Sequence, residues 1–144
     1  MFPAVTALLP HRRPMLLLDA LTGVQNNQIQ AIFTVREDNI FLRSDGTLEA
    51  VALLEAMAQC FAAGQGLRGS GQNRVGYLAA VRRCNITGEA HLGDILCASA
   101  RAVAQVGAII IVEGEMTRGE EKLASAEFKI YTLLATEEAK EGTL

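Results

Sequence analysis

The sequence has few cysteines, and they form no recognisable motif. Cys60, Cys84 and Cys97 lie far apart, without a CxxC spacing and without the Cys/His pairs of a zinc site. An odd, dispersed set of cysteines is typical of reduced core thiols in a cytosolic protein. We therefore expect no metal site among them.

The sequence also lacks basic clusters and targeting segments. It has 13 lysines and arginines and a formal net charge of -3, with no basic block and no interleaving of basic and aromatic residues. Nucleic acid is therefore not an expected partner. The start of the chain has no charged segment followed by an apolar stretch and a cleavage site, and the apolar runs are too short for a membrane span. These absences predict a cytoplasmic protein without a membrane span.

The residues that are present indicate one globular domain. The chain has 144 residues, of which 50% are hydrophobic and 20% are charged. This is enough for one hydrophobic core in a single domain over residues 1–144. Residues 136–144 are polar, and we expect this tail to fray.

A long apolar helix is predicted over residues 47–66. The segment is rich in alanine and leucine, and the residues before it are typical of a helix start, with Asp45 as the expected N-cap. Glu49 and Glu55 are its only charged residues, and its apolar residues are spread around the whole circumference. A helix with this pattern is expected to be buried.

Glu55 lies in the middle of that helix. A buried carboxylate is costly unless it is paired, hydrogen-bonded or protonated, and such an environment suits a general acid or base. A structural interpretation stays open beside this one. Glu55 then lies on a narrow exposed stripe, or pairs with an arginine such as Arg82 or Arg83.

Six strands are predicted around the helix. Two precede it and four follow it, after a flexible loop at residues 69–73. A helix that is apolar on all sides needs a sheet to cover it, so the sequence predicts an α+β fold with an antiparallel sheet curled round the helix. The predicted strands are residues 20–24, 28–35, 76–85, 95–105, 108–117 and 122–134.

Four segments occur in the order found in a known family. They are residues 9–19 (LPHRRPMLLLD), 54–59 (LEAMAQ), 76–81 (GYLAAV) and 93–96 (GDIL). Over roughly residues 8–132 the chain resembles the 3-hydroxyacyl-(acyl carrier protein) dehydratases of fatty-acid synthesis. The resemblance implies the hot-dog fold, an antiparallel sheet wrapped around one long central helix, and a dehydratase-like role with Glu55 as acid/base.

The chain departs from this family at the catalytic histidine. In the family, a histidine from the neighbouring subunit works with the helix glutamate and precedes it by about fourteen positions, which corresponds to Phe41 here. The Pro-Gly pair that follows in the family is replaced by Glu49 and Ala50. This pattern is similar to the dehydratase-like proteins of aryl-polyene pathways, in which hot-dog subunits can occur in pairs with one member catalytically defective.

Dehydration of a 3-hydroxyacyl thioester needs a base for the proton next to the thioester and an acid for the departing hydroxyl. Only His11 and His91 remain as histidines. His11 lies in a proline-bounded connector and is the candidate partner of Glu55; alternatively it is a solvated or carbonyl-bonded turn residue. His91 is expected at the surface. Gln59, one helical turn after Glu55, is placed to bond Glu55 or a substrate group, or to cap a buried polar pair.

Four further residues are candidates for substrate binding. Phe41 and Tyr77 are candidates for lining an acyl tunnel, or are core or interface residues. Arg12 and Arg13 are candidates for binding the phosphate of a phosphopantetheine arm or the acidic surface of a carrier protein, or are solvated. No other cofactor is expected, because the resemblance implies a substrate carried on phosphopantetheine.

Three functions therefore remain open. The first is a carrier-protein-dependent 3-hydroxyacyl dehydratase that uses Glu55 and His11. The second is a catalytically defective hot-dog subunit that supports an active dehydratase, and the third is an acyl thioesterase that activates water with Glu55. Each version implies a homodimer, or a heterodimer with another hot-dog subunit, because sheet edges join across two subunits in this family.

Overall fold

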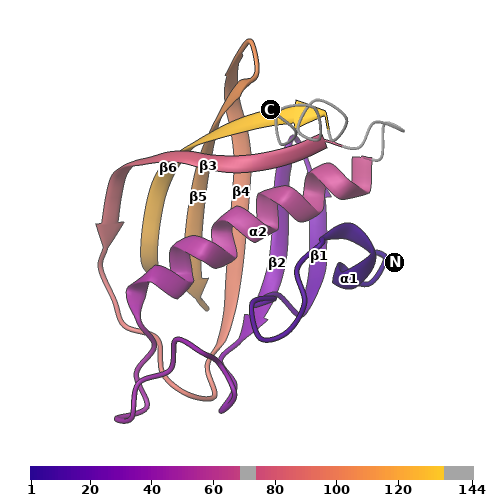
Figure 1. Cartoon of the computed structure of the whole chain (residues 1–144). Coiled ribbons are helices and arrows are strands. Elements are labelled where there is room, and N and C mark those ends of the chain that lie inside the picture. Colours follow the sequence, from indigo (N-terminus) through magenta and orange to yellow (C-terminus); the bar gives the residue numbers. More distant parts are fainter. Residues whose placement is uncertain (69–73, 135–144) are drawn as a thin grey trace, which may run out of the picture.

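The computed structural model describes residues 1–68 and 74–134, in which a six-stranded antiparallel sheet packs against one long helix (Figure 1). The strand order is β1-β2-β4-β5-β6-β3. The predicted α+β fold with an antiparallel sheet curled round the helix is confirmed. The elements are α1 (Val5–Leu8), β1 (Ala20–Gln25), β2 (Gln28–Thr34), α2 (Ala50–Arg68), β3 (Arg74–Ile86), β4 (Ile95–Val106), β5 (Ile109–Arg118) and β6 (Glu121–Leu134).

The helix α2 begins three residues later than predicted, at Ala50. The preceding segment is held in extended bridges, Leu42 to Leu48 and Thr47 to His91, so it cannot also be helical. Asp45 is not the N-cap. Its carboxylate accepts hydrogen bonds from the Thr47 amide and hydroxyl at 3.0 and 2.6 Å, which closes a local turn. The predicted loop at residues 69–73 and the tail at 136–144 lie outside the described residues.

Alternate residues of the strands and most of α2 form the core. On β2, Ile29, Ala31 and Phe33 are buried, as expected for a strand with one face toward the helix. A Cβ on Gly114 of β5 would lie 3.1 Å from the Cβ of Met57 on α2, so glycine permits the close approach of helix and sheet. The packing of α2 against the strands therefore fixes the position of the helix on the sheet.

The prediction that α2 is buried on all sides is wrong in one respect. A stripe along the helix is exposed or half-buried, because one curled sheet covers only part of the circumference. Glu55 lies on this stripe, as the structural alternative anticipated. The stripe consists of Val51, Leu54, Glu55, Ala58, Ala62 and Gln65.

The helix has the length and composition of a membrane span, but half of its residues are buried inside the fold, as in the core helix of a soluble protein.

The two edges of the sheet are β1 and β3. β3 is 13 residues long and pairs with β6. Several of its large apolar side chains are exposed: Tyr77, Leu78, Val81 and Ile86. A long edge strand with apolar side chains is a surface on which another chain can pair.

Candidate functional site

The exposed stripe of α2 brings Glu55 to the connector between α1 and β1. His11 of that connector lies beside it, with its Nε2 3.8 Å from Glu55 Oε1. The two side chains are 30% and 29% exposed, so both are partly covered and both are reachable from solvent. The distance is within ion-pair range but longer than a direct hydrogen bond. Catalytic pairs are often this loose before substrate binds.

Gln59 holds the carboxylate of Glu55 in place. Its side-chain amide donates to Glu55 Oε1 at 2.9 Å and to the Met15 carbonyl at 2.8 Å, and its Oε1 accepts from the Leu17 amide at 2.9 Å. Gln59 is 1% exposed. A buried amide with its hydrogen bonds made is rigid. It therefore fixes one oxygen of Glu55 and ties the connector to α2 at the same point.

The connector is closed by its own arginines. Arg12 Nη1 donates to the carbonyls of Leu9 and His11 at 2.9 and 2.7 Å. Arg13 Nη1 donates to the Leu16 carbonyl at 3.0 Å, and its Nη2 donates to Asp19 at 3.2 Å. Both guanidinium groups therefore bond the segment in which they lie. Their predicted contact with a phosphate or a carrier protein stays a prediction.

Asp19 anchors the far end of the connector to β2. Its carboxylate accepts from Arg36 at 2.6 Å and from the Thr34 amide at 2.8 Å. Burial alone would raise the pKa of Asp19, but the hydrogen bonds from Arg36 and Thr34 outweigh burial and hold that pKa below its ordinary value. Asp19 is thus ionised near neutral pH and fixes where the connector joins the sheet.

The imidazole of His11 has one nitrogen toward the site and one buried. Nδ1 is buried and has no hydrogen-bond partner among residues 1–68 and 74–134. Of the two ring nitrogens, Nε2 is the one that faces Glu55. A histidine ring is usually oriented by a hydrogen bond from its second nitrogen, and this one is placed without such a bond.

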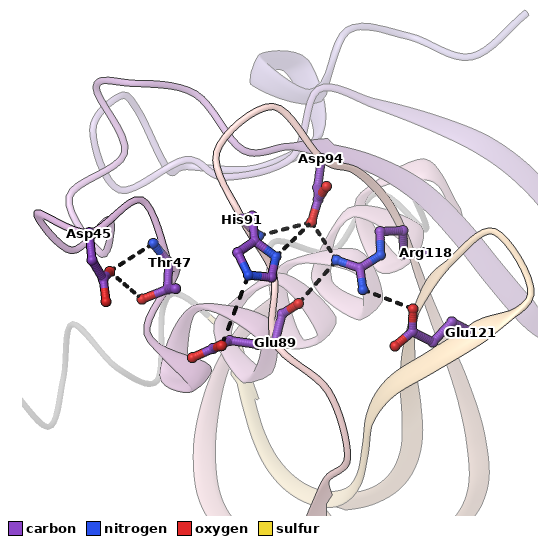
Figure 2. Close-up of polar contacts among 7 residues, drawn as sticks. All are labelled: Asp45, Thr47, Glu89, His91, Asp94, Arg118 and Glu121. Atoms are coloured by element: carbon purple, nitrogen blue, oxygen red, sulfur yellow. Dashed lines mark hydrogen bonds and ion pairs between the residues drawn. The ribbon is translucent and has the colours of Figure 1, made fainter.

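His91 lies in a different part of the molecule, at the turn between β3 and β4 (Figure 2). Its ring is 52% exposed, 3.8 Å from Asp94 and 4.0 Å from Glu89. Burial would raise the pKa of Asp94, but hydrogen bonds from the His91 amide and from Arg118 outweigh it and lower that pKa. The cluster joins this turn to Arg118 and Glu121 of the β5–β6 turn. The surface position predicted for His91 is confirmed.

The other predicted residues lie on the elements expected of them. Phe41 packs against the core just before α2, and its amide donates to Asn39 at 2.8 Å. Tyr77 is on β3, where it is 40% exposed. Their roles in a tunnel stay predictions. Among residues 1–68 and 74–134, Glu55 makes its ion pair with His11 and not with Arg82 or Arg83; Arg83 lies 3.8 Å from Glu127 instead.

Sequence reasoning placed Glu55, Gln59 and His11 as candidates but missed how the connector is held. It did not anticipate that Gln59 bonds the backbone of Met15 and Leu17, or that Arg12 bonds two carbonyls of its own turn. The signal available was the turn itself: three polar residues, His11, Arg12 and Arg13, lie between two prolines. Which group an arginine bonds depends on the folded path of the chain, and the sequence does not display that path.

Comparison with known proteins gives a family match over most of the chain. The model of the ApeP-like family, described as ApeP dehydratase, matches residues 3–140. The uncharacterized protein YcsD of Bacillus subtilis is 29% identical over 125 residues, which cover 85% of this chain and 94% of that protein. The 3-hydroxyacyl-[acyl-carrier-protein] dehydratase FabZ of Streptococcus thermophilus is 27% identical over 116 residues, covering 78% of this chain and 82% of that one.

Solved structures show the same fold. The dehydratase heterocomplex ApeI:P from Xenorhabdus doucetiae matches with a TM-score of 0.86 at 24% identity, covering 97% of each chain. A hypothetical thioesterase from Streptococcus pneumoniae, solved with coenzyme A, matches with a TM-score of 0.62 at 16% identity, covering 79% of this chain and 84% of that one. At these identities the similarity shows the fold alone, and it confirms the hot-dog architecture.

Proposed function

Because the chain belongs to the ApeP-like family of hot-dog dehydratases, we propose that it removes water from 3-hydroxyacyl thioesters held on the phosphopantetheine of an acyl carrier protein. The observation that carries this proposal is the 3.8 Å approach of His11 Nε2 to Glu55 Oε1 within one chain. In the 3-hydroxyacyl-(acyl carrier protein) dehydratases that the sequence resembles, the catalytic histidine corresponds to Phe41 here. His11 is therefore the histidine that supplies the second proton-transfer group.

The chemistry requires two proton transfers. A base removes the proton on the carbon next to the thioester carbonyl, and an acid gives a proton to the hydroxyl on the following carbon. The C–O bond breaks, a C=C bond forms, and the products are an enoyl thioester and water. Glu55 and His11 together supply the acid and the base, and Gln59 keeps Glu55 Oε1 in one position while the proton moves.

The proposal is tested by giving the protein a 3-hydroxyacyl thioester on a carrier protein and following the products by mass spectrometry. Loss of water is the expected reaction, and Glu55→Gln or His11→Ala should slow it by about a hundredfold or more. Glu49→Gln is the matched control, because Glu49 is exposed and lies just before the same helix. An unchanged rate in Glu55→Gln removes this carboxylate from the mechanism. A free thiol in place of the enoyl thioester would identify a thioesterase.

A second function has support from a different observation. The chain has Phe41 where the 3-hydroxyacyl-(acyl carrier protein) dehydratases that it resembles have their histidine, and a structurally similar protein is part of a heterocomplex. In this version the chain pairs with another hot-dog subunit and shapes its site. The protein alone would then be inactive toward the thioester, and activity would return when the partner is added. Light scattering of the protein alone and of the mixture measures the assembly directly.

The surface we propose for this pairing is the free edge of β3. Its backbone hydrogen-bonding groups and exposed apolar side chains lie on the same strand. Pairing along 13 residues would extend the sheet into a second subunit, whether that subunit is another copy or a different chain. A monomer at micromolar concentration, with or without a partner, would contradict this.

A further inference from the structure

The position of His11 depends on groups other than its own ring. Nδ1 is buried and has no hydrogen-bond partner in the described part of the chain. Nε2 is 3.8 Å from Glu55, too far for a strong bond to orient the ring. The imidazole is therefore placed by the backbone that carries it, and whatever fixes that backbone sets its distance from Glu55.

The connector is fixed on both sides of His11. On the C-terminal side, Gln59 bonds the carbonyl of Met15 and the amide of Leu17. The amides of Met15 and Leu16 both donate to the Arg12 carbonyl, at 2.9 and 3.0 Å, and form a tight turn. These bonds position residues 12–17 relative to α2. None of these bonds is made by His11 itself, so another contact must position its backbone.

Arg12 supplies the contact that positions the His11 backbone. One nitrogen of its guanidinium, Nη1, donates to the carbonyls of both Leu9 and His11. The two carbonyls lie on either side of Pro10, so the arginine closes a small loop around the residue before His11. Leu9 is 3% exposed and belongs to the core. Through Arg12, the His11 carbonyl is therefore linked to a residue that is packed in the hydrophobic core.

We infer that Arg12 is a positioning residue for His11: it holds the imidazole toward Glu55 through the backbone, without touching the site. This inference rests on the proposed function only where activity is concerned. The link between Arg12 and the separation of His11 from Glu55 is a property of the folded chain. The neighbouring Arg13 bonds the Leu16 carbonyl and Asp19 instead, so it is the matched control.

The chain is well suited to a direct test because it has only two histidines. Their ring signals are assigned by proton–nitrogen NMR with His11→Gln and His91→Gln. In the otherwise wild-type chain, Glu55→Gln should shift the His11 ring signals and leave those of His91 in place. In Arg12→Met, which keeps a long apolar stem but has no donor, Glu55→Gln should shift the His11 signals by less than half as much. In Arg13→Met the full shift should remain.

Two outcomes of the NMR comparison would overturn the inference. In the first, Glu55→Gln shifts the His11 signals equally in the Arg12→Met and wild-type backgrounds. In the second, it shifts nothing in the wild-type background, so that there is no contact for Arg12 to hold. If Arg12→Met fails to fold, Arg12→Lys is measured in its place. A lysine retains a donor but not the planar fork, so part of the shift should be lost.

The activity measurement is separate. Arg12→Met should lower kcat for water loss by about tenfold to a hundredfold with little change in KM, because a misplaced catalytic group slows the chemical step rather than binding. A raised KM with unchanged kcat would instead assign Arg12 to substrate binding and overturn the positioning role. If the wild-type protein has no activity, the NMR comparison still decides the inference, and only the proposed function fails.

Discussion

Replacing Gln59 with leucine tests the connection between the helix and the connector. Leucine has a similar volume, so the change removes hydrogen bonds without leaving a large cavity. The three bonds that disappear join Gln59 to Glu55, Met15 and Leu17. The expected result is a less stable protein with a displaced connector.

The loss of stability depends on whether water can replace Gln59 at each of its three hydrogen-bond partners. The Leu17 amide belongs to a residue that is 2% exposed, so it stays unsatisfied, which costs about 1–3 kcal/mol. Met15 is 45% exposed and Glu55 is partly exposed, so water can replace their lost partner at about 0.5–1 kcal/mol each. The free energy of unfolding should therefore fall by about 2–5 kcal/mol. Most domains survive such a loss.

The assay is urea unfolding followed by circular dichroism, with activity measured on the same preparations. Gln65→Leu is the control, because it is the same substitution on an exposed position of the same helix. It should change stability by less than about 0.5 kcal/mol. If the two variants unfold at the same urea concentration with the same slope, Gln59 does not hold the connector and the reasoning about the site is wrong.

Two further predictions concern ionisable groups. The pKa of Asp19 is lowered in the folded state, so its ion pair with Arg36 stabilises the protein above the ordinary carboxyl pKa of 3.8, and this stabilisation is lost as pH falls through the lower folded pKa. At pH 7 the unfolding free energy of the wild type should exceed that of Asp19→Asn by about 1 kcal/mol after solvent screening. A difference of the same size at pH 2 would contradict this. Burial raises the pKa of Cys60 to about 12, whereas Cys84 is exposed, so a thiol reagent at pH 8 should modify Cys84 first and Cys60 only in unfolding concentrations of denaturant, as read by mass spectrometry of the labelled peptides.

The strands were predictable because their ends carry turn residues. The predicted strands leave residues 25–27 between them, and in the structure Asn26 and Asn27 both have positive φ, at 52° and 65°, and connect β1 to β2. This is the two-residue hairpin turn that asparagine favours. Gly93 and Gly119 also have positive φ at the turns that enter β4 and β6. In each case a local backbone requirement selects the residue type, and the sequence displays it.

The helix start and the site were less accessible to prediction. Leu42 and Leu48 pair with each other, and Thr47 pairs with His91 from a distant loop, so tertiary contacts replaced the first turn that local propensity favoured. Glu55 and Gln59 were found because both lie on one helix at a fixed spacing. His11 is 44 residues from Glu55 along the chain, and their proximity depends on how the connector crosses the helix. Pairwise spacing cannot show that crossing.

The free edge of β3 also bears on how such a chain is made in a cell. A newly synthesised copy presents a 13-residue strand at the edge of its sheet, with several exposed apolar side chains, and such an edge can template aggregation. Arg82 and Arg83 are exposed on this strand and carry like charge, so they discourage indiscriminate stacking of strands. Under the pairing proposed above, a second subunit covers this edge. The proposal therefore predicts that the solubility of the chain on overproduction rises with the supply of that subunit, which would make the balanced synthesis of the two part of its proteostasis.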